Sequence, residues 1–299
     1  MIFNKIFQKF LSTKTKKQGE KIILIIAIIS YLSHLFLILL NNYGALEIQS
    51  TFLENPVAAI YTPFSFILVY EVYLLIFYLP QSISLYIGKQ YEIITLIVIR
   101  RIFKDIANLE LNVEWFHNQS DLQFTYDIVT SLVLFFLIFL FYKHITKRQK
   151  NRTDKTPTDE SKIQKFIHFK KIIATLMVPV LFIFAIYTGF DWGIAVIRDY
   201  KNGIAAFKDI NNIFFDEFFT ALIIIDVLLL LSSFFYSDTF HKIMRNSGFV
   251  ISTILIKISF SSEGLINNTL IIGAVSFGFV ILIIHNLFEK WKEESVKVE

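Results

Sequence analysis

Cysteine is absent from this chain of 299 residues, and glycine (10 residues) and proline (5 residues) are scarce. The lack of cysteine excludes disulfides, cysteine-ligated zinc, iron–sulfur clusters and cysteine nucleophiles. The low glycine and proline content excludes a collagen-like or low-complexity chain. Charged residues make up only 18% of the chain, whereas hydrophobic residues make up 55%. Because a soluble domain has about 25% charged residues, this composition is not that of an ordinary soluble protein.

Short motifs of known chemistry are missing as well. The chain has no phosphate-binding loop, no G-x-S-x-G nucleophile turn and no potassium-filter sequence. The six histidines form no H-E-x-x-H or other paired ligand spacing, and His34 and His285 are interpreted as hydrogen-bonded packing residues. We therefore expect no metal, no cofactor, no nucleic-acid partner and no enzymatic activity.

What the chain does have is long apolar runs. A helix needs about 20 residues to cross a ~30 Å hydrocarbon core. Six runs meet this length clearly, and two are weaker because they are short or carry charged residues. The sequence thus predicts an all-α integral membrane protein with eight transmembrane helices. The predicted spans are 22–40, 57–83, 92–109, 122–143, 171–190, 214–236, 247–262 and 267–288.

The basic residues give this topology its orientation. Segment 1–21 holds six lysines and one acid, and segment 143–171 holds ten Lys or Arg and three acids. Cytoplasmic segments are enriched in Lys and Arg, so these two segments lie on one side and an even number of spans separates them. The weak span 92–109 supplies the fourth span. Loops 41–56 and 110–121 contain acids but no Lys or Arg, as expected on the outer side.

The same argument applies to the second half, whose tail after residue 288 is again basic. Both termini are therefore predicted to be cytoplasmic, and the Ile-, Lys-, Asn- and Phe-rich composition favours a bacterial inner membrane. The predicted segments are a basic arm (1–21), a first four-span unit (22–143), a polar basic linker (144–166), a second four-span unit (167–288) and a tail (289–299).

An internal repeat is predicted from charges inside the spans. Glu71 lies in the second span of the first unit, and Asp226 lies in the second span of the second unit. The third spans carry Arg100 and Lys257, which follow the acids by 29 and 31 residues. Matching acids and bases at similar spacing favour two tandem units, which would be parallel repeats because each has an even number of spans.

Charges near the middle of a bilayer are costly and normally pair or face a hydrated interior. We expect Glu71 to pair with Arg100 and Asp226 to pair with Lys257. Arg100 and Lys104 are four residues apart and share a helix face, and Arg101 is placed to pair with Asp105 in the same way. The acids near span ends are interpreted as ordinary boundary charges in contact with water. These acids are Glu92, Asp127 and Glu217.

Two functional hypotheses follow. In the first, the protein is a channel or transporter for an ion, a proton or a small solute, and its candidate site residues are Glu71, Arg100, Arg101, Lys104, Asp226 and Lys257. In the second, it is a membrane scaffold, signalling or assembly subunit that binds a cytoplasmic protein or anionic lipid through its basic segments. A homo-oligomer is compatible with both hypotheses. A purely structural role for the charge pairs also stays open.

Overall fold

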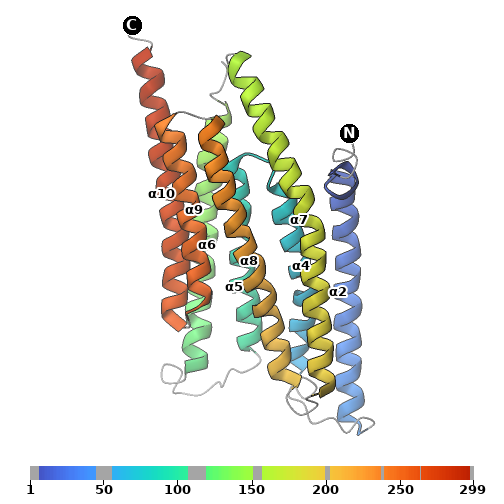
Figure 1. Ribbon diagram of the computed structural model, residues 1–299. Coiled ribbons are helices and arrows are strands. Elements are labelled where there is room, and N and C mark those ends of the chain that lie inside the picture. Colours follow the sequence, from blue (N-terminus) through green and yellow to red (C-terminus); the bar gives the residue numbers. More distant parts are fainter. Residues whose placement is uncertain are drawn as a thin grey trace. The chain divides into compact units, whose positions relative to one another are not determined.

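A computed structural model describes most of the chain. The described residues are 7–44, 56–106, 119–150, 157–198, 203–236, 239–262 and 264–296, without some of the side chains inside the helices. Over these residues the protein is helical, with no β-strand (Figure 1). The elements are α2 (Thr13–Asn42), the 3₁₀-helix η1 (Pro56–Ile60), α4 (Tyr61–Tyr78), α5 (Ile83–Ile106), α6 (Gln119–Lys150), α7 (Pro157–Arg198), α8 (Gly203–Tyr236), α9 (Phe240–Phe260) and α10 (Gly264–Val296).

Six of the helices in the described part of the chain are long and apolar enough to cross a membrane, namely α2, α6, α7, α8, α9 and α10. The all-α prediction is confirmed for these residues, and the six helices are compatible with a polytopic membrane protein. The predicted spans 57–83 and 92–109 overlap α4 and α5, which are not among the six. The count of eight spans therefore stays a prediction.

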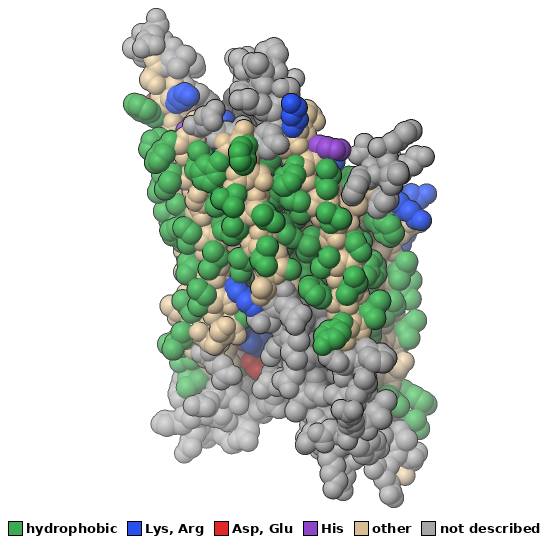
Figure 2. Space-filling model, viewed as in Figure 1, with side chains coloured by type: hydrophobic (Ala, Val, Ile, Leu, Met, Phe, Trp, Pro, Cys, Tyr) green, Lys and Arg blue, Asp and Glu red, His purple; other side chains and the backbone are tan. Residues whose placement is uncertain are grey.

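Large apolar side chains lie on the outside of these helices. On α2, Ile28, Leu32 and Phe36 are 59%, 58% and 60% exposed, whereas Ala27, His34 and Ile38 are buried. Figure 2 shows such side chains covering much of the described surface on one face. Exposure to water costs about 25 cal/mol per Å² of apolar surface, so an outer surface of this kind is suited to lipid.

The chain divides into two compact units, each built from three separate segments. Unit 1 contains residues 1–77, 96–128 and 175–218, and unit 2 contains residues 78–95, 129–174 and 219–299. Both units combine parts of the first and second halves of the sequence. The tandem repeat of two four-span halves stays a prediction.

In unit 1, polar contacts attach α2 to its neighbours. Ser12 caps the start of α2 by accepting a hydrogen bond from the Thr15 amide at 3.1 Å. The Nδ1 atom of His34 lies 2.6 Å from the Thr62 hydroxyl of α4. His34 is thus the hydrogen-bonded packing residue that the sequence predicts. Because α2 begins at Thr13, the second half of the basic arm is helical, and residues 1–6 lie outside the described part.

In unit 2, α9 and α10 pack against each other and α5 reaches both. Gly264 adopts a φ of 64° where α10 begins, a conformation that glycine adopts without strain. The Tyr91 hydroxyl of α5 lies 2.8 Å from the Ser252 hydroxyl, which donates to the Ala274 carbonyl at 2.7 Å. These contacts hold α5, α9 and α10 together around the buried residues described next.

A candidate ion site around Asp226

Asp226 is the centre of a buried polar cluster in unit 2. It lies on α8 and is only 4% exposed. The Nε2 atom of Gln90, on α5, donates to its Oδ2 atom at 3.0 Å. Gln90 is itself 1% exposed. An amide and a carboxyl group thus face each other in the interior of unit 2.

The hydroxyl group of Thr253 extends this contact to α9. The Thr253 hydroxyl lies 2.9 Å from the Oε1 atom of Gln90 and donates a hydrogen bond to it. Gln90 therefore accepts from Thr253 and donates to Asp226. This orientation follows from the chemistry of the groups, because the amide oxygen only accepts and the amide nitrogen only donates. The Tyr86 hydroxyl also lies near the Asp226 carboxyl group.

Lys170 of α7 supplies the positive charge of the cluster. Its side chain is buried, and its Nζ atom donates to the Gln81 carbonyl oxygen at 2.6 Å. The Lys170 charge acts on Asp226 through space. Lys170 belongs to the basic segment 143–171 that the sequence analysis assigned to the cytoplasmic side, and its burial was not expected.

A small pocket lies beside the carboxyl group. Asp226, Tyr86 and Asn246 line it together with apolar side chains such as Ile83 and Phe249. Asn246 is fixed by α8, because its amide nitrogen donates to the Ser233 hydroxyl at 3.3 Å. The surface that lines the pocket is apolar, so the carboxyl group of Asp226 is packed behind this wall and is not open to the pocket.

The other predicted charge pair lies in unit 1. Glu71 of α4 and Arg100 of α5 are both 7% exposed. The Arg100 charge acts on the Glu71 carboxyl group. Their pairing as a transport element stays a prediction, as does the pairing of Asp226 with Lys257 of α9. Lys104 lies on α5, and its side chain is outside the described part.

Asp127 corrects the interpretation of the boundary charges. It was expected to sit in contact with water, but its side chain is fully buried at 0% exposure. The Nη2 atom of Arg101 donates to Asp127 Oδ1 at 2.7 Å, and Arg101 Nε bonds Oδ2. Gln123, one helical turn earlier, donates to Oδ1 at 2.8 Å. Arg101 thus forms a two-contact ion pair between α5 and α6, and its predicted pairing with Asp105 stays a prediction.

Glu92 agrees with its interpretation as a boundary charge. Its carboxylate pairs with the Lys89 ammonium at 2.7 Å, and both side chains are partly exposed. The side chain of Glu217, the third acid of that group, lies outside the described residues.

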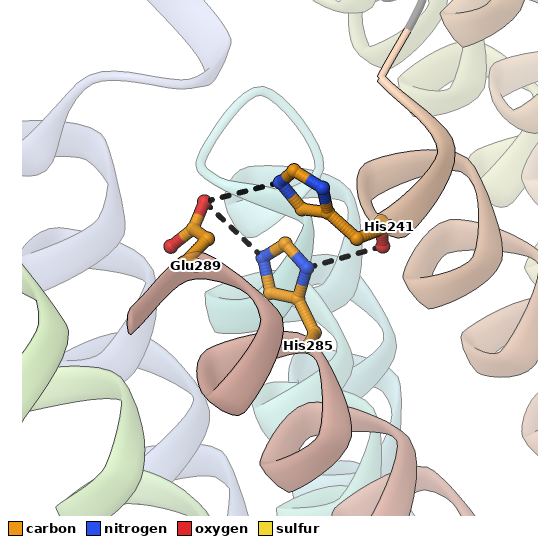
Figure 3. Close-up of side chains that lie close together, drawn as sticks. All are labelled: His241, His285 and Glu289. Atoms are coloured by element: carbon orange, nitrogen blue, oxygen red, sulfur yellow. Dashed lines mark hydrogen bonds and ion pairs between the residues drawn. The ribbon is translucent and has the colours of Figure 1, made fainter. Parts of the chain in front are cut away.

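Three further residues form a cluster that the sequence analysis missed. His241 of α9 meets His285 and Glu289 of α10, and their ligand atoms all lie within 4.8 Å of one another (Figure 3). His285 and Glu289 are four residues apart and share a helix face. That spacing was visible in the sequence, but nothing in it placed His241 opposite them. The expectation that His285 makes hydrogen bonds within the fold is confirmed.

Comparisons of the chain with models of protein families, with curated proteins and with solved structures find no match. A function can thus be argued only from the residues of the chain, above all from the polar cluster at Asp226.

Proposed function

We propose that the protein is a polytopic membrane protein that moves a proton or a small cation across the membrane, with Asp226 as the group that binds it. The six long apolar helices and their exposed apolar side chains support the membrane setting. The buried carboxyl group of Asp226 carries the functional part of the proposal. Ionisable residues inside a membrane segment are costly and mark ion paths and proton relays.

The hydrogen-bond partners of Asp226 explain why it suits this role. Gln90 and Thr253 orient the carboxyl group without neutralising it, since an amide and a hydroxyl carry no net charge. A buried carboxylate needs a counter-charge or a proton. The ammonium group of Lys170 is held by the Gln81 carbonyl oxygen instead of by Asp226. An arriving proton or cation can therefore bind to Asp226 without first breaking a direct salt bridge.

The remaining charged residues take secondary roles in this proposal. Glu71 would be a second cation-facing carboxylate, with Arg100 as its partner. Lys257 would sit farther along the path of the ion, one turn along α9 from Thr253. Arg101 is engaged with Asp127 and is assigned to helix packing. The protein would act without catalysis, in a bacterial inner membrane with both termini in the cytoplasm.

Ion and proton flux in proteoliposomes tests the proposal. The purified protein is reconstituted and an electrical potential is imposed, with wild type beside Asp226→Asn and Glu294→Gln. The Asn side chain keeps the shape of Asp but cannot release a proton or carry a charge. Glu294 is 65% exposed at the end of α10, so its variant is a matched carboxylate-to-amide control. We expect flux in wild type and Glu294→Gln and its loss in Asp226→Asn.

Two results would contradict the proposal. Flux that persists unchanged in Asp226→Asn would remove Asp226 from the ion path. No flux from a monodisperse wild-type protein under any gradient would favour the scaffold hypothesis. In that case the next experiment is capture of a cytoplasmic partner by the basic linker 144–166.

A further inference from the structure

We propose that His241, His285 and Glu289 form a binding site for a divalent transition-metal ion, of which Zn²⁺ is the best match. Its three ligands are not part of the Asp226 cluster, and the proposal does not depend on the transport proposal. The Oε1 atom of Glu289 lies 3.5 Å from His285 Nε2 and 3.9 Å from His241 Nε2. Figure 3 shows the three side chains converging from the start of α9 and the last turns of α10.

The three ligand atoms lie within 4.8 Å of one another and must move closer to hold a tetrahedral ion. Zinc bonds of about 2.0–2.1 Å to nitrogen and oxygen place neighbouring ligand atoms roughly 3.3 Å apart. Both distances to Glu289 are within about half an ångström of this value. A bound ion therefore requires side-chain rotation that brings the ligand atoms together. Three protein ligands leave the fourth position open for water, as in known zinc sites with two His and one carboxylate.

The tautomer of His285 is already set for metal binding. Its Nδ1 atom lies 3.1 Å from the backbone carbonyl oxygen of His241. A carbonyl oxygen only accepts, so Nδ1 carries the proton and Nε2 presents its lone pair to the cluster. A hydrogen bond of this kind from the far ring nitrogen is the usual support of a metal-binding histidine. His285 is also almost completely buried, which fixes the plane of its ring.

The guanidinium group of Arg245 already contacts the ring nitrogen of His285 that would bind the metal. The Nη1 atom of Arg245 lies 3.1 Å from His285 Nε2. The same guanidinium group makes two further bonds to Asn246 Oδ1, from Nη2 at 2.9 Å and from Nε at 3.2 Å. A metal ion would displace the contact of Arg245 with His285, whereas the two bonds to Asn246 involve none of the three proposed ligands. The cluster thus already accommodates a positively charged group.

The chemistry of the ligands selects the class of ion. Imidazole nitrogen binds zinc and other late divalent metals well, whereas calcium and magnesium prefer oxygen ligands. Because His241 lies on α9 and the other two ligands lie on α10, a bound ion would cross-link these two helices at their ends. Binding should therefore stabilise the helix pair against unfolding.

Metal binding to the full-length protein tests the site. The protein is purified in detergent without a polyhistidine tag, stripped with a chelator and titrated with Zn²⁺ by calorimetry. Co²⁺ is added in a parallel experiment, because its visible absorption reports tetrahedral coordination. Wild type is compared with His285→Ala and Glu289→Gln. His168→Ala is the matched control, because His168 is an exposed histidine on α7.

We expect one Zn²⁺ per chain in wild type and in His168→Ala, with the intense Co²⁺ bands of a tetrahedral site. Loss of a ligand in His285→Ala or Glu289→Gln should weaken binding by more than about tenfold. Wild-type protein that binds no Zn²⁺ would overturn the proposal, whether or not the variants fold. Binding that is equally strong in His285→Ala, Glu289→Gln and His168→Ala would also overturn it, because the ion would then sit elsewhere.

Discussion

At the scale of the single residue, Gly278 has the least space for a side chain among the glycines whose surroundings the structure describes. A Cβ atom placed there would lie 1.8 Å from the Tyr91 hydroxyl oxygen. That hydroxyl is held by Ser252, which is fixed in turn by the Ala274 carbonyl oxygen. Tyr91 is buried and cannot turn away without losing these bonds. We predict that Gly278→Ala lowers the stability of the protein by about 1–3 kcal/mol, as for other overpacked cores.

The same helix provides the control for this prediction. Gly273 lies on α10 as well, and a Cβ atom there would meet nothing within 4 Å. Gly273→Ala should therefore leave the midpoint of thermal unfolding in detergent unchanged or raise it slightly, since alanine is the better helix former. Tyr91→Phe removes the hydroxyl oxygen and should recover part of the stability lost in Gly278→Ala. If the effects of the two substitutions were simply additive, the clash would not be the cause of the loss.

At the scale of the helix, the Arg101–Asp127 ion pair connects α5 with α6 in unit 1. Asp127 is fully buried and accepts hydrogen bonds from both Arg101 and Gln123. Removing one partner of such a pair leaves the other charge without compensation. We predict that Asp127→Asn destabilises the protein by about 2 kcal/mol, the size of a hydrogen bond to a charged group.

Thermal unfolding of purified Asp127→Asn beside Glu294→Gln checks this prediction. Glu294 pairs with Lys290 on the surface of α10, where both side chains are more than half exposed. An exposed pair of this kind contributes only about 0–1 kcal/mol, so the control should unfold at nearly the same temperature as wild type. Equal effects of the two substitutions would mean that the buried pair gives no special stabilisation.

Asp127 also illustrates how far the sequence could lead. Apolar runs predicted where helices form, because run length and composition are properties of one segment. Depth along a helix could likewise be estimated from its ends, and by that estimate Asp127 lay close to water. Its burial depends instead on the side chains that surround it, above all Arg101 of α5 and Gln123 of α6. Lateral packing of this kind is decided by helices far apart in the sequence and is not visible in any one of them.

The same reason separates the predicted and the unpredicted parts of the candidate site. Asp226 stood out in the sequence because an acid inside an apolar run is unusual. Gln90 and Thr253 carry no such signal, since uncharged polar residues are common in helices. Lys170 does carry a charge, but its position within the basic segment 143–171 made it indistinguishable from a cytoplasmic lysine. The site became recognisable only when packing within unit 2 brought these residues to Asp226.

At the scale of the whole molecule, the number of times the chain crosses the membrane depends on α4 and α5. The other helices keep the same orientation whether or not α4 and α5 cross the membrane. Two consecutive spans return the chain to the side from which it started, so removing both changes nothing for the helices that follow. The discriminating position is the short turn between α4 and α5. Gln81 lies in this turn with an exposed side chain. If the chain has eight spans, Gln81 lies on the cytoplasmic side.

The absence of cysteine makes this turn directly testable. A single cysteine at any position gives the only thiol of the protein, so labelling by a membrane-impermeant maleimide reports one site. We predict that Gln81→Cys in intact cells reacts only after the membrane is permeabilised. Tyr43→Cys serves as the outer reference, because Tyr43 is 86% exposed at the end of α2 and should react from outside. Labelling of Gln81→Cys in intact cells would show that α4 and α5 do not carry the chain to the cytoplasm, and the count of eight spans would be wrong.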